Sequence, residues 1–299
     1  DYTGDQRIGP EILKGVADSY RRLRNTLRFM LGALSTFEEK DRVSPEEMPE
    51  LEKWVLHRLV ELDHTVRTGY AAYDFQGVFQ ALFNFCTVDL SAFYFDIRKD
   101  ALYCDGDSAR RRAARTMLDI LFHRLTTWLA PILVFTSEEV WHSRYGAEEV
   151  MAKLGDEPFS IHLEDIPVTP GDWRNDPLAD TVARIRRVRR VVTAALEVQR
   201  QEKVIGSSLE AAPVVHVEDP EVLALLRQVP MDDLCITSGL TLSGDPSPAE
   251  AFRLPEIEGV GVVFEKADGA KCQRCWKILP DVGSHSHDGV CGRCDEALG

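Results

Sequence analysis

Long apolar runs are missing from this sequence. No stretch approaches the roughly 18 uninterrupted apolar residues that a membrane span requires, and nothing resembles a signal peptide. Positive charge is also scarce, because 35 Lys and Arg stand against 49 Asp and Glu, which gives a net charge of −14. This balance argues against a nucleic-acid partner at first sight, although a local basic stripe can still bind phosphates. We expect no membrane partner.

Cysteine is sparse except near the C-terminus. Three of the seven cysteines are scattered, at Cys86, Cys104 and Cys235, whereas the other four form two CxxC pairs close to the chain end. This asymmetry favours a reducing, cytoplasmic location with one metal site over a secreted disulfide framework. The chain also begins with Asp1 rather than methionine, so we expect it to be a piece of a longer protein.

Residues 10–145 show helical periodicity almost throughout. The first predicted helix carries an apolar stripe at alternating spacings of four and three: Val16, Tyr20, Leu23, Leu27, Met30 and Leu34. We place the second helix after Pro49, beyond the entry signal Ser44–Glu47. Its stripe consists of Leu51, Val55, Leu59, Leu62 and Val66.

Three more helices complete the expected bundle. The third, near 74–98, is rich in aromatic residues that we assign to the core in preference to the alternative of a base-stacking role: Phe75, Phe79, Phe83, Phe93 and Tyr94. The fourth extends from about Asp107 to Ala130, and Thr136–Glu139 offers a capping box for a short fifth helix. We therefore predict a helical bundle over residues 1–155.

The rest of the chain has a different character. Between Gly155 and Pro177 the composition shifts to Pro, Asp and Gly, which indicates a connection between domains. A basic helix is predicted over 178–202. After this helix, short β-type runs are predicted at 214–217, 235–237 and 260–264. A further helix is predicted at 221–228 and a loop at 244–248. The predicted fold is therefore mainly α, with a small α+β segment over 156–265 and a cysteine module over 266–299.

The strongest chemical signal is the pair of motifs Cys272-Gln-Arg-Cys275 and Cys291-Gly-Arg-Cys294, separated by fifteen residues. Two CxxC pairs at this separation can place four thiolates tetrahedrally around one Zn²⁺. A redox role for each pair is the alternative, but the βαβ pattern typical of such motifs is missing. Because four thiolates close the metal shell, we expect one structural zinc without catalysis, and we expect His285 and His287 to stay off the metal.

Several other motifs occur in order along the chain. They are Asp1–Gly9 with Tyr20–Phe29, Trp54–Leu59, Leu129–Ile132, Phe135–Trp141, Lys203–Ala211, Cys272–Trp276 and Asp281–His285. In this order they resemble the C-terminal half of bacterial isoleucyl-tRNA synthetases. Leu129–Ile132 and Phe135–Trp141 are similar to motifs that class I synthetases for isoleucine, valine and leucine share. The segment Lys203–Ala211 and the cysteine module favour isoleucine.

The resemblance implies a class I anticodon-binding bundle that binds tRNA(Ile). The parent family attaches isoleucine to tRNA with ATP, through an aminoacyl-adenylate. Its HIGH and KMSKS motifs, which bind ATP and stabilise the transferring phosphate, are absent from this sequence, and so is the editing domain that hydrolyses misacylated products. We therefore expect no catalytic residue in this chain, no activity of the chain alone, and a monomer.

RNA loops are held by Arg and Lys on phosphates and by aromatic or Arg planes against splayed bases. The candidate tRNA-binding residues are Arg21, Arg24, Asn25, Arg28, Arg184, Arg187, Arg190, Arg274 and Trp276. The alternative for the arginine faces is a solvated surface paired with the chain's many carboxylates. Trp276 also has two interpretations, as a stacking platform for a nucleotide or as a cover over the metal site.

Two other functions remain open on the sequence. DNA glycosylases of the formamidopyrimidine type end in a similar four-cysteine module, but their N-terminal catalytic proline and substrate domain are not recognisable here. The second alternative is a protein-interaction scaffold in which zinc staples the tail. A preference for tRNA with the isoleucine anticodon would separate the synthetase interpretation from both.

Overall fold

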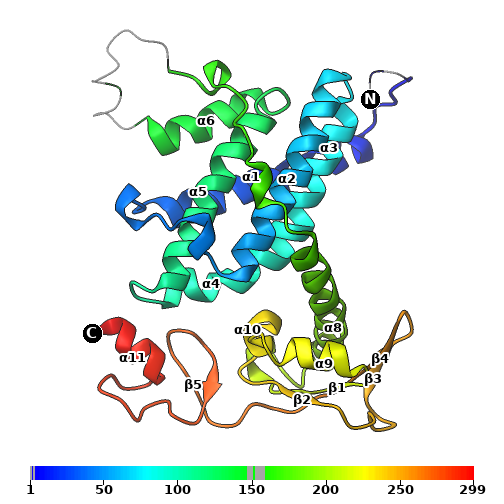
Figure 1. Ribbon diagram of the computed structural model, residues 1–299, viewed down its shortest axis with the longest axis vertical. Coiled ribbons are helices and arrows are strands. Elements are labelled where there is room, and N and C mark those ends of the chain that lie inside the picture. Colours follow the sequence, from blue (N-terminus) through cyan, green and yellow to red (C-terminus); the bar gives the residue numbers. More distant parts are fainter. Residues whose placement is uncertain (1, 3, 147–150, 152–158) are drawn as a thin grey trace. The chain divides into compact units, whose positions relative to one another are not determined.

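The computed structural model of the chain describes residues 2, 4–146, 151 and 159–299 (Figure 1). The chain divides into two compact units, the first made of Asp1–Arg98 and Ser108–Asn175, the second of Lys99–Asp107 and Asp176–Gly299. The division into three parts at 155 and 265 stays a prediction. The first residues of the connection expected from Gly155 to Pro177 lie outside the described residues.

The first unit is a helical bundle, as predicted (Figure 1). Its helices are α1 (Pro10–Leu34), α2 (Glu50–Ala71), α3 (Phe75–Asn84), the first residues of α4 (Phe95–Cys104), α5 (Ala109–Leu129) and α6 (Val134–Tyr145). Four short 3-10 turns are η1 (Glu39–Asp41), η2 (Pro45–Glu47), η4 (Ile161–Leu163) and η5 (Gly171–Trp173). Helix α5 packs against α1, α2 and α6 and is buried along most of its length, so it forms the centre of the core.

The two predicted apolar stripes have different outcomes. All five stripe residues of α2 are buried, and this helix begins directly after Pro49, as expected. On α1 only the stripe from Leu23 to Leu34 is buried, whereas Val16 is 63% exposed and Tyr20 is 38% exposed. The apolar stripe of α1 is therefore buried in its C-terminal half and partly exposed in its N-terminal half. Periodicity indicates an apolar face, but on α1 this face is buried only from Leu23 onward.

The predicted third helix is longer and less regular than expected. It continues from α3 through a π-helical segment, η3 (Phe85–Tyr94), into α4 and ends at Cys104 rather than near 98. Phe93 and Tyr94 are buried as predicted, but Phe75 is 40% exposed. By length and composition alone Phe75–Cys104 could cross a membrane; half of its most apolar window is buried inside the structure, as in the core helix of a bundle.

The capping box expected at Thr136 does not start α6. This helix begins two residues earlier, at Val134, and both Thr136 and Ser137 are buried within it. The Thr136 hydroxyl instead shares a hydrogen bond with Tyr20, at 2.9 Å. Glu138 accepts hydrogen bonds from Ser160 and from the Ile161 amide, so its carboxylate caps η4 rather than its own helix.

Residues 159–175 lie along the bundle of the first unit instead of leaving it. Arg67 donates a hydrogen bond to the carbonyl of Pro167 at 2.8 Å, and Arg124 donates to that of Val168 at 3.1 Å. The Arg124 guanidinium also lies 4.7 Å from the ring centroid of Trp173, a cation–π contact. The two arginines thus supply hydrogen-bond donors to backbone carbonyls of a segment that has little secondary structure of its own.

The second unit combines a long helix with a small sheet, as the prediction of an α+β segment requires (Figure 1). Its elements are α8 (Asp176–Gln201), η6 (Ser208–Glu210), β1 (Val214–Val217), α9 (Pro220–Leu226), α10 (Met231–Cys235), β2 (Thr241–Ser243), β3 (Phe252–Leu254), β4 (Ile257–Val263), β5 (Ala270–Lys271), β6 (Ile278–Leu279) and α11 (Gly292–Leu298). The four-stranded sheet has the order β2-β1-β4-β3, with β1 parallel to β2 and antiparallel to β4. Helix α8 packs on β4 and β3 through its buried apolar stripe.

One predicted strand is wrong. Residues 235–237 have β-type side chains, but Cys235 ends α10 and Ile236 adopts a left-handed φ of 58° that terminates the helix. Tertiary contacts favour the helix here, because Arg189 donates a hydrogen bond to the carbonyl of Leu234 at 2.6 Å. Lys277 holds the first turn of α10 through ion pairs with Asp232 and Asp233.

Candidate metal centre and basic surfaces

The four cysteines of the two CxxC pairs lie together and are all buried. Cys272 and Cys275 lie in the turn of the β5–β6 hairpin, while Cys291 precedes α11 and Cys294 is in its first turn. Their sulfur atoms are all within 4.8 Å of one another, and the Cys275 and Cys291 sulfurs are 3.7 Å apart. A tetrahedral site with Zn–S bonds of about 2.3 Å requires sulfur atoms about 3.8 Å apart. The cluster therefore fits Zn²⁺ by its donor set and spacing.

Backbone conformation brings the two halves of the cluster together. The Gln273 amide donates to the carbonyl of Gly289 at 2.9 Å, which joins the first CxxC turn to the segment before the second. Gly289 has a left-handed φ of 74°, and a Cβ at this position would lie 2.6 Å from the Gln273 side chain. The left-handed φ therefore favours glycine at this position, and an added side chain would also displace the Gln273 amide.

The sulfur atoms have unequal electrostatic surroundings. Burial acts to raise the pKa of Cys272, but backbone amides of Cys275, Cys291 and Arg274 donate to this sulfur and lower its pKa to about 6. Burial raises the pKa of Cys275 and of Cys291. Amide donors aimed at a sulfur stabilise the thiolate, which is the form that binds a metal.

The two histidines of the module are engaged elsewhere. His285 lies 2.9 Å from a carboxylate oxygen of Asp281, and His287 lies 2.8 Å from one of Asp295. Among the described residues, the group of side chains close enough to share a metal contains the four cysteines and neither histidine. The expectation that these histidines stay off the metal remains a prediction.

Trp276 directly follows the second cysteine of the buried cluster and is itself exposed. Its side chain is 61% exposed, and the ammonium of Lys271 lies 5.8 Å from its ring centroid. Its φ of 67° is in the left-handed region, which is uncommon for a bulky residue. An exposed indole beside a cation is a surface that a nucleotide base can stack on, so the exposure does not favour a covering role over the metal site.

The arginines predicted on α1 are exposed, but two of them have acidic partners. Arg21 pairs with Asp18 at 2.9 Å and Arg24 with Glu139 at 3.2 Å, both in exposed ion pairs. Asn25 and Arg28 are exposed on the same helix. Exposed ion pairs contribute about 0–1 kcal/mol, so a phosphate can displace them at little cost.

The arginines predicted on α8 are likewise exposed. Arg184 and Arg187 border a groove of about 130 Å³ whose walls include Asp219, Val222 and Glu258. Arg190, one turn further along the helix, pairs with Glu256 at 2.6 Å. Within this unit the structure therefore places Arg184, Arg187 and Arg190 on solvent-facing positions of one helix. Arg274, by contrast, is only partly exposed and donates a hydrogen bond to the carbonyl of Cys104.

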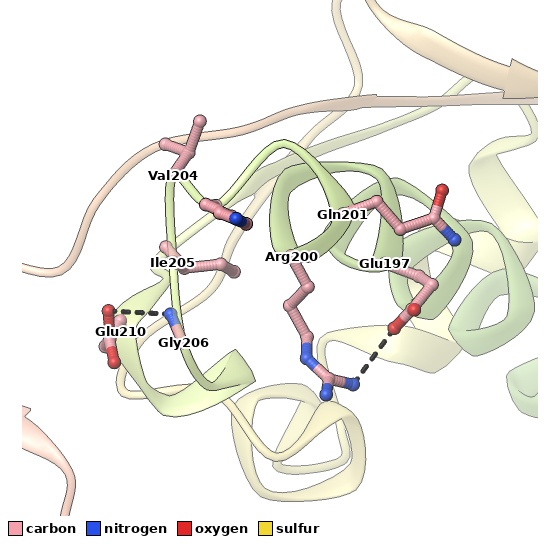
Figure 2. A pocket seen from close by; sticks show the side chains of 8 residues that line it. Glu197, Arg200, Gln201, Val204, Ile205, Gly206 and Glu210 are labelled. Atoms are coloured by element: carbon pink, nitrogen blue, oxygen red, sulfur yellow. Dashed lines mark hydrogen bonds and ion pairs between the residues drawn. The ribbon is translucent and has the colours of Figure 1, made fainter.

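A hollow that sequence patterns did not predict lies where α8 ends (Figure 2). It has a volume of about 450 Å³ and is bounded by the last turn of α8 and the segment that follows. Arg200 pairs with Glu197 at 3.0 Å, and Glu210 accepts a hydrogen bond from the Gly206 amide at 3.2 Å, as Figure 2 shows. The motif Lys203–Ala211 supplies part of its wall, and the last turn of α8 supplies the rest.

Comparisons with known proteins give two family matches. Residues 52–216 match the anticodon-binding domain of tRNA ligases, which covers most of the bundle together with α8 and β1. Residues 269–297 match a zinc finger found in formamidopyrimidine-type glycosylases and isoleucyl-tRNA synthetases. The first match covers more than half of the chain. The chain belongs to the anticodon-binding domain family of tRNA ligases.

Relatives of this anticodon-binding domain are isoleucine–tRNA ligases. That of Ruegeria pomeroyi is 74% identical over the full length of the chain, and those of Agrobacterium fabrum and Brucella abortus are 51% and 49% identical over 95% of it. The chain spans only 28–30% of the length of these relatives. The resemblance to isoleucyl-tRNA synthetases is thereby confirmed. Neither the glycosylase nor the scaffold alternative is favoured, because the likeness extends over the bundle as well as the zinc finger.

Proposed function

We propose that this chain binds the anticodon stem-loop of tRNA(Ile) as part of an isoleucine–tRNA ligase. The proposal is carried by the combination of an anticodon-binding family match over 52–216 with 74% identity to an isoleucine–tRNA ligase along the whole chain. The parent enzyme attaches isoleucine to tRNA(Ile) with ATP in the cytoplasm. In this proposal the chain supplies RNA binding, acts as a monomer, and contributes no catalytic residue.

The exposed arginines of α1 and α8 support this role. They present guanidinium groups on helical faces, where phosphates of an RNA backbone can be bound without desolvating a buried charge. The net charge of −14 does not prevent this, because Arg184 to Arg190 form a local basic stripe. Held by such a stripe, a loop can splay its bases toward an exposed aromatic ring such as that of Trp276.

We also propose that the module binds one Zn²⁺ per chain through Cys272, Cys275, Cys291 and Cys294. The four thiolates fill the metal's preferred tetrahedron, so no position is left for substrate or water and the metal is structural. When bound, the zinc supplies no chemistry beyond fixing the two turns. With the two turns fixed, Trp276 is held at the surface, because it directly follows the ligand Cys275.

Binding to matched RNAs tests the proposed function. Fluorescence anisotropy with tRNA(Ile), the same tRNA carrying another anticodon, and a duplex DNA should give tightest binding to tRNA(Ile). Preference for the DNA would support the glycosylase alternative. Absence of binding to any of the three, with zinc content intact, would reject RNA binding by this chain.

The α8 surface leads to a specific prediction. Replacing Arg184, Arg187 and Arg190 together with Ala should weaken tRNA binding and reduce its dependence on salt. Each phosphate contact to a single-stranded segment contributes about 0.7 to the slope of log K against log salt, so three lost contacts reduce it by about 2. The slope is measured by anisotropy titrations at several salt concentrations. As control, Arg227→Ala changes an exposed arginine elsewhere in the unit. An unchanged slope in the triple variant would show that the stripe is a solvated face.

Trp276 gives a second prediction. Trp276→Ala should lose about 1–3 kcal/mol of tRNA binding, the usual cost of removing one stacking platform. Zinc content should stay the same, because no ligand is removed. Trp276→Phe keeps an aromatic plane and should retain most of the affinity. If the Ala variant instead loses zinc, and its RNA affinity falls in parallel with its zinc content, the indole covers the metal site.

A further inference from the structure

The two CxxC motifs share a feature that zinc binding does not explain. Each carries an arginine at its third position, Arg274 in the first and Arg293 in the second. Both arginines reach the same segment, Lys99–Asp107, which comprises the end of α4 and the residues after it. This segment is about 170 residues away in the chain but belongs to the same compact unit as the cysteine module.

Arg274 contacts the last residue of α4. Its guanidinium donates a hydrogen bond to the carbonyl of Cys104, while the Cys104 thiol donates to the carbonyl of Arg274 at 3.6 Å. The last carbonyls of a helix lack intrahelical partners, and the helix dipole places partial negative charge there. A guanidinium at this position therefore satisfies an orphan acceptor and opposes that charge.

Arg293 contacts two carboxylates of the same segment. It donates two hydrogen bonds to Asp100, one of them at 2.7 Å, in a bidentate arrangement. The same guanidinium lies 3.5 Å from Asp105. Bidentate, charge-assisted pairs fix both distance and orientation, more firmly than a lysine ammonium does.

Packing supports the same attachment. The Cys104 side chain is buried in one cluster with the four cysteines and Val290. Gly106 lies against α11, because a Cβ added to it would be 3.6 Å from the Cα of Ala297. The segment is thus held by side chains from both CxxC turns and by the helix that follows the second one.

We propose that the cysteine module is a clamp on residues 99–107. The metal fixes the two CxxC turns, and the arginine of each turn then holds the end of α4 and the residues that lead into α5. Arg274 and Arg293 are positioning residues, so Arg274 is not available as a contact for RNA phosphate. This step relies on the proposed zinc only for the rigidity of the two turns.

The accessibility of Cys104 reports on the clamp. In the zinc-loaded chain, its labelling rate with a maleimide is measured by peptide mass spectrometry. Replacing Arg274 and Arg293 together with Ala should raise this rate roughly tenfold or more, because it removes the charge-assisted hydrogen bonds that hold the segment and opening becomes more frequent. Zinc content should not change. Arg227→Ala, with an exposed arginine of the same unit, should label like the unaltered chain.

Further variants keep the proposal testable if the double variant folds poorly. Asp100→Asn removes the partner of Arg293 and should also speed labelling, whereas Arg293→Lys should give an intermediate rate. Unchanged labelling in the arginine variants with zinc retained would overturn the clamp. Zinc loss from them would overturn it as well, because the arginines would then support the ligands rather than the segment.

Metal removal separates this proposal from the zinc assignment. Treatment with a chelator should release Cys104 to labelling at least as much as the arginine substitutions do. If metal analysis finds no zinc in the untreated chain, the zinc assignment fails, while the arginine variants still test the attachment. If zinc is present but chelation leaves Cys104 protected, the metal does not rigidify the clamp.

Discussion

Replacing Cys294 with Ser should abolish zinc binding and unfold the module that spans residues 269–297. The module has little core of its own, since its strands β5 and β6 have two residues each and its buried cluster consists mainly of cysteines. Structural zinc supplies about 10–16 kcal/mol of apparent binding free energy in comparable small modules. Loss of one thiolate therefore removes most of the folding free energy of this part of the chain.

Metal analysis and limited proteolysis measure the result. The unaltered chain should contain about one zinc and resist cleavage between residues 269 and 297, and Cys294→Ser should contain none and be cut there. The matched controls are His285→Ala and His287→Ala, which alter possible ligands of the same module and should keep the metal. Zinc loss in a histidine variant, together with retention in Cys294→Ser, would show that the ligand set is mixed.

The parts of this structure that were predictable have local causes. The buried stripe of α2 follows from residues three and four apart on one helix, and the start of this helix follows from Pro49. The four-cysteine cluster follows from two motifs that each place two sulfurs side by side. In these cases residues close together in the sequence determine the local structure, and distant contacts do not change it.

The wrong or missed parts have distant causes. Cys235–Thr237 has β-type residues, but the hydrogen bond from Arg189 and the ion pairs of Lys277 act on the preceding turn. Thr136 resembles a helix cap but is bound by Tyr20, more than a hundred residues earlier. The contacts of Arg274 and Arg293 with residues 99–107 were also missed, because they join segments about 170 residues or more apart in the chain. Periodicity and spacing contain no information about such partners.

The π-helical segment Phe85–Tyr94 was also beyond prediction, and it accompanies a buried ion pair. Glu52 of α2 is fully buried, and its carboxylate accepts hydrogen bonds from Arg98 at 2.6 and 2.7 Å and from the Tyr94 hydroxyl at 2.9 Å. The polar groups on both sides are thereby paired inside an apolar bundle. The π-helical segment includes Tyr94 and ends before Arg98, so it shifts the helical phase of Arg98 relative to α3, and sequence periodicity does not show this shift.

Glu52→Ala should destabilise the first unit by about 3–5 kcal/mol, because it leaves the Arg98 guanidinium buried without its carboxylate. Urea unfolding followed by tryptophan fluorescence measures this, since Trp54, Trp128, Trp141 and Trp173 all lie in that unit. The exposed pair of Asp18 and Arg21 provides the control: Asp18→Ala should change stability by about 0–1 kcal/mol.

A double substitution separates the cost of burying the Arg98 guanidinium without Glu52 from the value of the pair itself. Glu52→Leu combined with Arg98→Met removes both charges and fills similar volume, so it should recover most of the stability lost in Glu52→Ala. If the double variant is as unstable as the single one, the loss comes from packing or from Tyr94, whose hydroxyl loses its acceptor in both variants. Restoring that acceptor distinguishes these two causes: Glu52→Gln with Arg98→Met keeps an amide oxygen for Tyr94 and should then be the more stable variant.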